Sequence, residues 1–342
     1  MTVRDVIVIG AGPAGLATAI AASRRGLSYL VVEKGALVNS LLHYPTEMIF
    51  FTTPELMEIG GLPFVSPYEK PTRLEALRYY RRVTDALALE IVFDEAVVAV
   101  TREDGVPDSA GSFVVDTHSA RGVRRSVRGR TVVIATGAYD VPNLLDIPGE
   151  DLPHVSHYYT QPHPFFRKRV VVVGGKNSAA EAALDLYRAG ARVTLVHRGA
   201  ALSDSIKYWV KPDIENRLRE GTIEGRLETR VLEIRPTTVV VERAQVVSEL
   251  PADAVFLLTG YRSDSQLLRA AGVRIDPDTC GPVFDGTTFE TSVPGLYVAG
   301  AVVAGVQSGK IFIENGRFHG EQVIQAVARR LGAPAGAATP VS

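Results

Sequence analysis

The sequence contains one cysteine, Cys280, among its 342 residues. A single cysteine excludes an intramolecular disulfide, a redox-active pair of thiols and a cysteine-based metal site. Three histidines, His154, His157 and His163, lie in the proline-rich stretch 142–169. No cluster of acids or cysteines accompanies them, and the prolines oppose a regular helix that would carry metal ligands. We therefore predict that the chain holds no metal.

Charge of one sign and long apolar runs are also scarce. Lys and Arg number 37 and Asp and Glu 38, so the formal net charge is −1. No overall field attracts nucleic acid or an anionic membrane. No run approaches the roughly 20 apolar residues of a membrane span, and charged Arg4 and Asp5 precede a short apolar strand rather than the apolar core of a secretory signal. We expect a cytoplasmic protein without nucleic-acid or membrane partners.

Residues 5–33 carry the first strong pattern. An apolar run at 6–9 leads into Gly10-x-Gly12-x-x-Gly15, an alanine-rich helix follows, and a second apolar run at 29–32 ends at Glu33. This strand–turn–helix–strand arrangement is typical of a site for the pyrophosphate of a dinucleotide. The helix N-terminus offers free N–H groups to the phosphates, and the carboxylate of Glu33 can accept hydrogen bonds from ribose hydroxyls.

The same pattern returns at residues 169–198. A strand at 169–173 leads into a turn at Gly174, a helix is predicted over 178–189 with Gly190 as its stop signal, and a strand over 192–196 follows. As many residues separate Ala179 from His197 as separate Gly15 from Glu33. Two such patterns in register are far more specific than one.

The two patterns end in residues of opposite charge. Glu33 would repel a 2′-phosphate, whereas His197 and Arg198 can pair with one, and Lys207 can add a second cation. The second pattern therefore favours NADPH, and the first favours FAD or NAD.

The rest of the chain predicts further elements. We expect helices over 72–88, with Thr72 as N-cap, and over 311–330. We expect short strands at 91–93, 96–100, 113–117 and 126–127, and buried strands over 131–137 and 295–300. The basic run 121–130 alternates with Val and Gly, which favours an exposed hairpin over a nucleic-acid site.

The two buried strands resemble each other and flank the second pattern. We therefore predict an α/β fold with two Rossmann-like dinucleotide-binding domains. The NADPH-binding domain (151–289) would be inserted into the first domain (1–150 and 290–342), which would bind FAD or NAD.

Both patterns, the turn Ala135-Thr136-Gly137 and the strand ending at Gly300 together resemble thioredoxin-reductase-like flavoproteins with two dinucleotide-binding domains, over residues 3–330. The Cys-x-x-Cys of thioredoxin reductases is absent. The stretches 43–46, 50–60, 174–179, 205–207 and 312–320 are more similar to the bacillithiol disulfide reductase group, which also lacks that pair.

This resemblance implies two sets of contact residues. The set expected to bind FAD is Gly10, Gly12, Pro13, Ala14, Gly15, Glu33, Lys34, His43, Ala135, Thr136, Gly137, Gly300, Ala301, Lys310 and Ile311. The set expected to bind NADPH is Gly174, Gly175, Lys176, Asn177, Ser178, Ala179, His197, Arg198 and Lys207.

The sequence departs from the resembled pattern at three of these positions. Ala14 stands where the best-known bacillithiol disulfide reductases carry a cysteine beside the flavin. Lys176 replaces the usual second glycine of the nucleotide turn, and Ala301 replaces an aspartate found in many relatives. The missing cysteine matters most, because a thiolate normally opens a disulfide through a mixed disulfide.

The resemblance implies an enzyme that passes hydride from NADPH to flavin and then reduces an acceptor, as a homodimer. A low-molecular-weight disulfide such as bacillithiol disulfide is the first candidate acceptor. His43 is the candidate group next to the flavin, although a histidine bonded only to local backbone explains it equally well, and Cys280 is expected to be inert. Two alternatives stay open, electron transfer to ferredoxin or flavodoxin and a non-catalytic flavin redox sensor.

Overall fold

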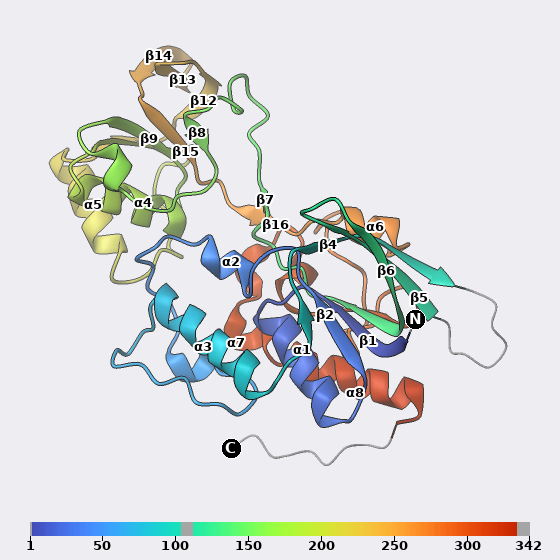
Figure 1. The fold of residues 1–342 in the computed structure, drawn as a ribbon. Coiled ribbons are helices and arrows are strands. Elements are labelled where there is room, and N and C mark those ends of the chain that lie inside the picture. Colours follow the sequence, from blue (N-terminus) through green and yellow to red (C-terminus); the bar gives the residue numbers. More distant parts are fainter. Residues whose placement is uncertain (1, 104–111, 334–342) are drawn as a thin grey trace. The chain divides into compact units, whose positions relative to one another are not determined.

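The computed structural model describes residues 2–103 and 112–333, which form two compact units (Figure 1). Unit 1 comprises Met1–Leu42, Thr52–Val141 and Tyr261–Ser342, and unit 2 comprises His43–Phe51 and Pro142–Gly260. Each unit contains one sheet with parallel central strands. The chain thus has the expected mixed α/β architecture.

The sheet of unit 1 has the strand order β3-β2-β1-β6-β5-β4, and β17 pairs with β6. Its strands are β1 (Val3–Ile9), β2 (Tyr29–Val32), β3 (Ile91–Val92), β4 (Glu95–Glu103), β5 (Ser112–Ser119), β6 (Arg124–Ile134) and β17 (Leu296–Val298). β1, β2, β3, β17 and the second half of β6 are parallel, whereas β4, β5 and the first half of β6 form an antiparallel meander. Strand residues such as Ile7 and Val132 are fully buried, as expected for a sheet covered on both faces.

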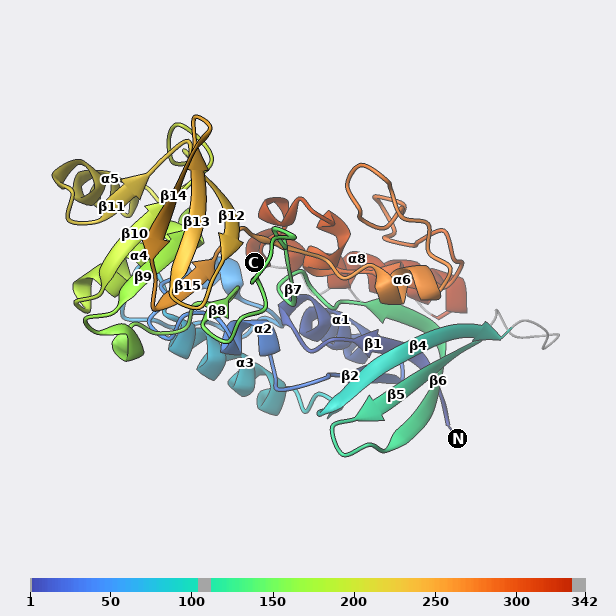
Figure 2. The same cartoon turned by 90° about the horizontal axis from the view of Figure 1, so that it is seen from above.

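Helices cover this sheet (Figures 1 and 2). The helical segments of unit 1 are α1 (Pro13–Arg24), α2 (Asn39–Leu42), η1 (Pro54–Met57), α3 (Arg73–Ala86), α6 (Gln266–Ala270), η3 (Gly300–Ala304), η4 (Ser308–Lys310), α7 (Ile313–Gly316) and α8 (His319–Leu331). α1 and α8 pack side by side. α3 begins with a capping box in which the Thr72 hydroxyl accepts the Glu75 N–H and the Glu75 carboxylate accepts the Thr72 N–H.

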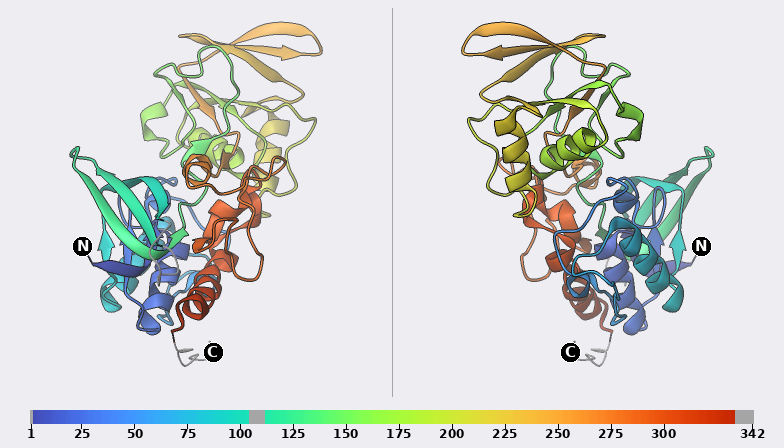
Figure 3. Two further views of the ribbon diagram at one scale, coloured as in Figure 1. Left: turned by 90° about the vertical axis from the view of Figure 1, so that its right-hand side faces the viewer. Right: turned by 90° about the vertical axis from the view of Figure 1, so that its left-hand side faces the viewer.

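Unit 2 has three layers. Its parallel sheet has the order β11-β10-β9-β15-β8. These strands are β8 (Val155–Ser156), β9 (Arg169–Val173), β10 (Arg192–Val196), β11 (Glu224–Arg226) and β15 (Ala254–Leu257). The helices α4 (Asn177–Arg188) and α5 (Lys211–Glu220) pack on one face. The antiparallel strands β12 (Arg230–Ile234), β13 (Thr238–Arg243) and β14 (Val246–Pro251) pack on the other, at the top of both views of Figure 3.

Short elements complete the chain. η2 (His163–Phe165) precedes β9. β7 (Val141–Pro142) pairs with β16 (Tyr261–Arg262), and these strands lie where the chain passes from unit 1 to unit 2 and back. None of the helices in the described residues has the length and hydropathy that crossing a membrane requires. The same residues contain no group of three or more His, Cys, Asp or Glu that could hold a metal ion.

Several predicted elements are confirmed. α3 matches the helix expected over 72–88, α4 matches the one expected over 178–189, and β10 has the predicted bounds. The basic run 121–130 forms the predicted hairpin, because β5 and β6 pair on either side of a turn that contains Gly122.

Two element predictions are wrong. The strands expected at 126–127 and 131–137 are one strand, β6, which pairs with β5 through its first half and with β1 through its second. The helix expected over 311–330 is broken into α7 and α8. At the break, the Arg317 guanidinium donates to the carbonyl oxygens of Glu55 and Glu58, which ties the chain to η1.

The compact units also divide the chain at other points than the predicted domains do. Residues 142–150 belong to unit 2 and residues 261–289 to unit 1. The short segment 43–51 belongs to unit 2, although both of its chain neighbours belong to unit 1.

Candidate functional site

The first glycine turn packs tightly between β1, β6 and α1. Gly10 has φ +105°, and a Cβ at this position would lie 2.6 Å from the carbonyl oxygen of Ala135. A Cβ at position 15 would collide with the carbonyl oxygen of Gly10. Both glycines are therefore needed for the chain itself to pack, and they bring Ala135 beside the start of α1.

Gly12 differs from these two glycines. A Cβ built on Gly12 would meet no atom of the described chain within 4 Å, and its φ of −76° suits any residue. Gly12 is the N-cap of the 12-residue helix α1, and no side chain caps the helix at this point. The N–H groups at this N-terminus therefore depend on a partner other than a capping side chain, which fits an anionic ligand.

Glu33 follows β2 and is 5% exposed. Its two carboxylate oxygens accept the backbone N–H groups of Ala11 at 2.7 Å and Gly35 at 3.0 Å. These bonds fix the carboxylate at the glycine turn, and each oxygen still has a lone pair for a further hydrogen bond. The predicted ribose acceptor and the predicted phosphate turn are thus held together.

Gly300 completes this site from the far end of the sequence. A Cβ on Gly300 would lie 2.6 Å from the Cβ of Ala14, so the turn after β17 touches the first turn of α1. Gly316 of α7 packs against both Gly300 and Ile311. The structure thereby brings together four separate stretches of unit 1, which are 10–15, 33–35, 135–137 and 300–316. The predicted contacts Thr136 and Gly137 lie in the third of these stretches, directly after Ala135.

The remaining predicted flavin contacts are more scattered. Lys34 forms an ion pair with Asp140 at 2.7 Å. The carbonyl oxygen of Lys310 accepts the Asn315 side-chain amide, and that of Ala301 accepts the Ser263 hydroxyl. His43 is exposed and lies in the segment that belongs to unit 2.

His319 also belongs to this site, although the sequence analysis predicted no role for it. It is 8% exposed at the start of α8, and its Nδ1 accepts the backbone N–H of Gly300 at 3.1 Å. Its ring lies 4.3 Å from that of Phe289 between centroids. Burial lowers the pKa of His319 to about 4. The residue lies within the stretch 312–320, but sequence alone does not show that its ring turns back to Gly300.

The glycine turn of unit 2 follows β9. A Cβ on Gly174 would lie 2.6 Å from the carbonyl oxygen of Leu258, and one on Gly175 would overlap the imidazole of His197. Lys176 is exposed and is the N-cap of the 12-residue helix α4, where no side chain caps the helix. Burial, and next the charge of Arg198, lower the pKa of His197. The carboxyl ends of β9 and β10 thus bring Lys176, His197 and Arg198 to the start of α4.

The ammonium of Lys207 is bonded to other residues of unit 2. Its side chain is 3% exposed, and its ammonium pairs with Glu181 at 2.6 Å and donates to the carbonyl oxygen of Ile49 at 2.9 Å. The ammonium predicted to bind NADPH is therefore already paired within the protein.

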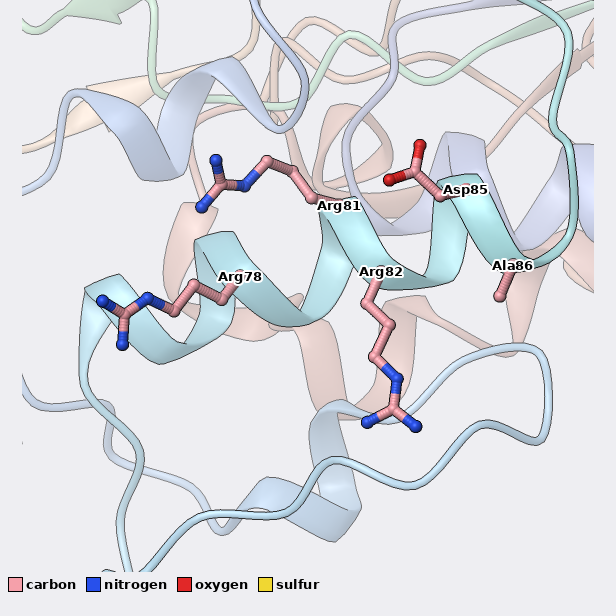
Figure 4. A pocket seen from close by; sticks show the side chains of 5 residues that line it. All are labelled: Arg78, Arg81, Arg82, Asp85 and Ala86. Carbon is pink, nitrogen blue, oxygen red and sulfur yellow. The ribbon is translucent and has the colours of Figure 1, made fainter.

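Two further features carry no cofactor signal. A shallow hollow of about 630 Å³ on α3 is lined by Arg78, Arg81, Arg82, Asp85 and Ala86. Figure 4 shows that its three guanidinium groups leave the helix in separate directions and do not converge on one point. Cys280 is half-buried in a loop of unit 1, where its Sγ contacts the carbonyl oxygen of Pro277 at 3.9 Å.

The His319 environment predicts a specific loss of stability in acid. The unfolded histidine takes up a proton near pH 6.5, whereas the folded one resists protonation until about pH 4. The stabilising contribution is complete above pH 6.5 and is lost as the pH falls through this window. We expect the urea midpoint of the wild type to fall more between pH 7 and pH 4.5 than that of His319→Asn, whose amide oxygen can still accept the Gly300 N–H. Parallel pH profiles of the two proteins would contradict this account.

Comparison with known proteins identifies a family that is consistent with two nucleotide-binding turns. A model of the pyridine nucleotide-disulphide oxidoreductase family matches residues 7–300. Bacilliredoxin reductase Bdr of Bacillus subtilis is 41% identical over 331 residues, which covers 96% of this chain and 99% of that protein. The structure of bacillithiol disulfide reductase Bdr from Bacillus cereus superposes with a TM-score of 0.92 at 40% identity, and the match covers 96% of this chain and 100% of the other.

A more distant relative has a different name. Ferredoxin–NADP reductase of Ignicoccus hospitalis is 27% identical over 308 residues, which covers 87% of this chain and 90% of that protein. The predicted resemblance and the predicted class of enzyme are both confirmed. The chain belongs to the pyridine nucleotide-disulphide oxidoreductase family of FAD- and NAD(P)-binding flavoproteins, and it is an oxidoreductase similar to bacillithiol disulfide reductase Bdr over nearly its whole length.

Proposed function

We propose that this chain uses NADPH to reduce a low-molecular-weight disulfide of the bacillithiol type, with FAD held by unit 1 and NADPH by unit 2. The observation that carries the proposal is the pair of glycine turns, one fixed to a buried carboxylate and the other followed by cations. The names of the Bdr relatives supply the substrate class. The nucleotide-binding unit would be inserted into the flavin-binding one.

The residues of unit 1 fit FAD. The uncapped start of α1 offers to the pyrophosphate the backbone N–H groups of its first turn, apart from Pro13, which has none. Glu33 is fixed where it can accept ribose hydroxyls. Ala14, Ala135 and Gly300 form a close-packed wall of small residues next to this turn. When bound, FAD supplies the capacity to accept a hydride and pass on its electrons.

The residues of unit 2 fit NADPH. The start of α4 offers N–H groups to the pyrophosphate, and Arg198 forms no ion pair with any residue in the described ranges. A guanidinium that is free of carboxylates can bind a phosphate through two parallel hydrogen bonds. Lys176 adds a second charge at the same turn. We propose that Arg198 and Lys176 together distinguish NADPH from NADH.

Reduction of the disulfide would proceed without a thiol at the flavin turn, because residue 14 is alanine. The overall reaction converts one disulfide, NADPH and a proton into two thiols and NADP⁺. Cys280 is the only thiol of the chain and lies in the loop 276–282. The two electrons would therefore pass to the substrate sulfur atoms directly from the flavin, and no mixed disulfide with the protein would form.

A one-electron carrier protein is the second candidate acceptor. The absence of a thiol at position 14 favours it, because electron transfer to an iron–sulfur protein or a flavodoxin requires no protein thiol. The relative named ferredoxin–NADP reductase spans most of this chain.

The choice of acceptor predicts a clear kinetic result. After anaerobic reduction with NADPH, we expect bacillithiol disulfide to reoxidise the flavin with repeated turnover, and Cys280→Ser to do so at the wild-type rate. Rapid reoxidation only by ferredoxin or flavodoxin would replace the disulfide by the second candidate. Failure of every acceptor to give turnover would support the non-catalytic redox sensor instead.

The glycine turn of unit 1 predicts opposite effects for two similar substitutions. Gly12→Ala adds a methyl group that meets no described atom of the chain, so the protein should fold normally and bind FAD at least about 10-fold more weakly, because the backbone could no longer approach the pyrophosphate. Gly15→Ala should destabilise the protein without FAD, because its methyl group collides with Gly10. Thermal unfolding and FAD titration measure the two effects. Normal FAD binding by Gly12→Ala would refute this placement of the pyrophosphate.

Arg198 predicts the nucleotide preference. Loss of a charge-assisted hydrogen bond costs about 1.5–3 kcal/mol, so Arg198→Ala should reduce the preference for NADPH over NADH about 10- to 100-fold. Arg192→Ala is the matched control, because Arg192 begins the same strand at its opposite end. Unchanged preference in Arg198→Ala, measured by flavin reduction with both nucleotides, would contradict the assignment.

A further inference from the structure

The environment of Lys207 gives this residue a different role from the one that its sequence position predicts. The ammonium donates to the carboxylate of Glu181 at 2.6 Å and to the carbonyl oxygen of Ile49 at 2.9 Å. It also lies 5.7 Å from the centre of the Trp209 ring. With its side chain 3% exposed, Lys207 is enclosed by partners that compensate its charge.

Lys207 is also bonded to the helix that begins at the nucleotide turn. Its backbone N–H donates to the side-chain oxygen of Asn177 at 2.9 Å. Asn177 is the first residue of α4, and Glu181 lies one turn further along the same helix. One residue thus contacts the first two turns of α4, directly behind Gly174–Lys176.

Ile49 brings a third element into this cluster, the segment 43–51. This segment is fastened to unit 2 at two more points. Both the backbone N–H and the hydroxyl of Thr46 donate to the carbonyl oxygen of Thr160, at 2.9 and 3.2 Å. The Phe51 ring stacks on Trp209 with 5.9 Å between centroids. Within unit 2, Lys207 therefore links the nucleotide-binding helix to a segment that includes His43.

A buried lysine in such a cluster is a poor phosphate ligand. To reach a phosphate, the ammonium would have to leave both the carboxylate of Glu181 and the carbonyl oxygen of Ile49. The same bonds suit a residue that holds two segments in one geometry. A misplacement of about 1 Å in a reactive complex can lower its rate about 100-fold.

We propose that Lys207 is a positioning residue that fixes the segment 43–51 to α4, so that nucleotide bound at the start of α4 and the segment containing His43 keep one geometry during flavin reduction. This inference rests on the proposed function, since it takes NADPH to bind at Gly174–Lys176. It assigns no contact with the 2′-phosphate to Lys207. Discrimination between NADPH and NADH is left to Arg198 and Lys176.

The test separates rate from nucleotide preference. Anaerobic stopped-flow measures flavin reduction by NADPH and by NADH in the wild type, Lys207→Met, Glu181→Gln and Arg198→Ala. Lys207→Met should lower the limiting rate about 10- to 100-fold with both nucleotides, with an unchanged ratio of their dissociation constants. Glu181→Gln should lower it in the same way but less. Arg198→Ala should do the reverse, with a changed ratio and a nearly normal limiting rate.

Two further measurements distinguish positioning from a purely structural role. Trp209 is the only tryptophan of the chain and contacts both Lys207 and Phe51. Its fluorescence in Lys207→Met should be more accessible to acrylamide, which reports release of the segment. Lys207→Arg, which can keep both hydrogen bonds, should restore the limiting rate and the protection of Trp209. If Lys207→Met does not fold, Glu181→Gln, which weakens the ammonium's ion pair and keeps the lysine, takes its place in both measurements.

Three outcomes would overturn the proposal. Weaker binding of NADPH alone in Lys207→Met, with a normal limiting rate, would make Lys207 a phosphate ligand. A lower melting temperature with normal rates would leave it a structural residue only. Slow flavin reduction with unchanged exposure of Trp209 would remove the segment 43–51 from the explanation. A wild-type flavin that NADPH does not reduce would contradict the proposed function itself, which the fluorescence measurement does not depend on.

Discussion

The close approach of α1 to the carboxyl end of β1 is the constraint on which the arrangement of unit 1 depends. Gly15 lies against the carbonyl oxygen of Gly10, and Gly10 lies against Ala135, so there is no room for a side chain at either position. This packing places the N-terminus of α1 at the edge of the sheet where Glu33 and Gly300 also lie. Of the three glycines in this turn, only Gly12 has free space beside it, and free space at that position is what a bound pyrophosphate requires.

Patterns confined to neighbouring residues predicted the fold well. The glycine turns, the N-cap at Thr72 and the strand 192–196 all follow from local chemistry, and the structure contains each of them. The predictions were wrong where contacts between distant residues set the bounds of an element. β6 is continuous because β5 and β1 pair with its two halves, and the break between α7 and α8 coincides with the bonds from Arg317 to η1. The periodicity of apolar residues in a sequence does not show which distant residues an element will contact.

The candidate sites show the same division. Residues next to the glycine turns could be named from sequence, because the spacing of strand, turn and helix places them. Side chains that return from elsewhere could not. His319 reaches Gly300 from α8, and the ammonium of Lys207 is bonded to Glu181 and Ile49. A cation close to a phosphate motif in sequence is therefore weak evidence for a phosphate contact until its burial and partners are known.

Position 14 limits what the family resemblance can say about mechanism. Its Cβ would touch a Cβ at position 300, so this residue belongs to the wall that Gly300 and Ala135 form beside the flavin turn. An alanine at position 14 packs against Gly300 but supplies no nucleophile. Cys280 lies in the loop 276–282, so the glycine turn of unit 1 has no thiol at which a disulfide would be opened. Under the proposed function, a disulfide would therefore have to be reduced without a mixed disulfide to the protein at this turn.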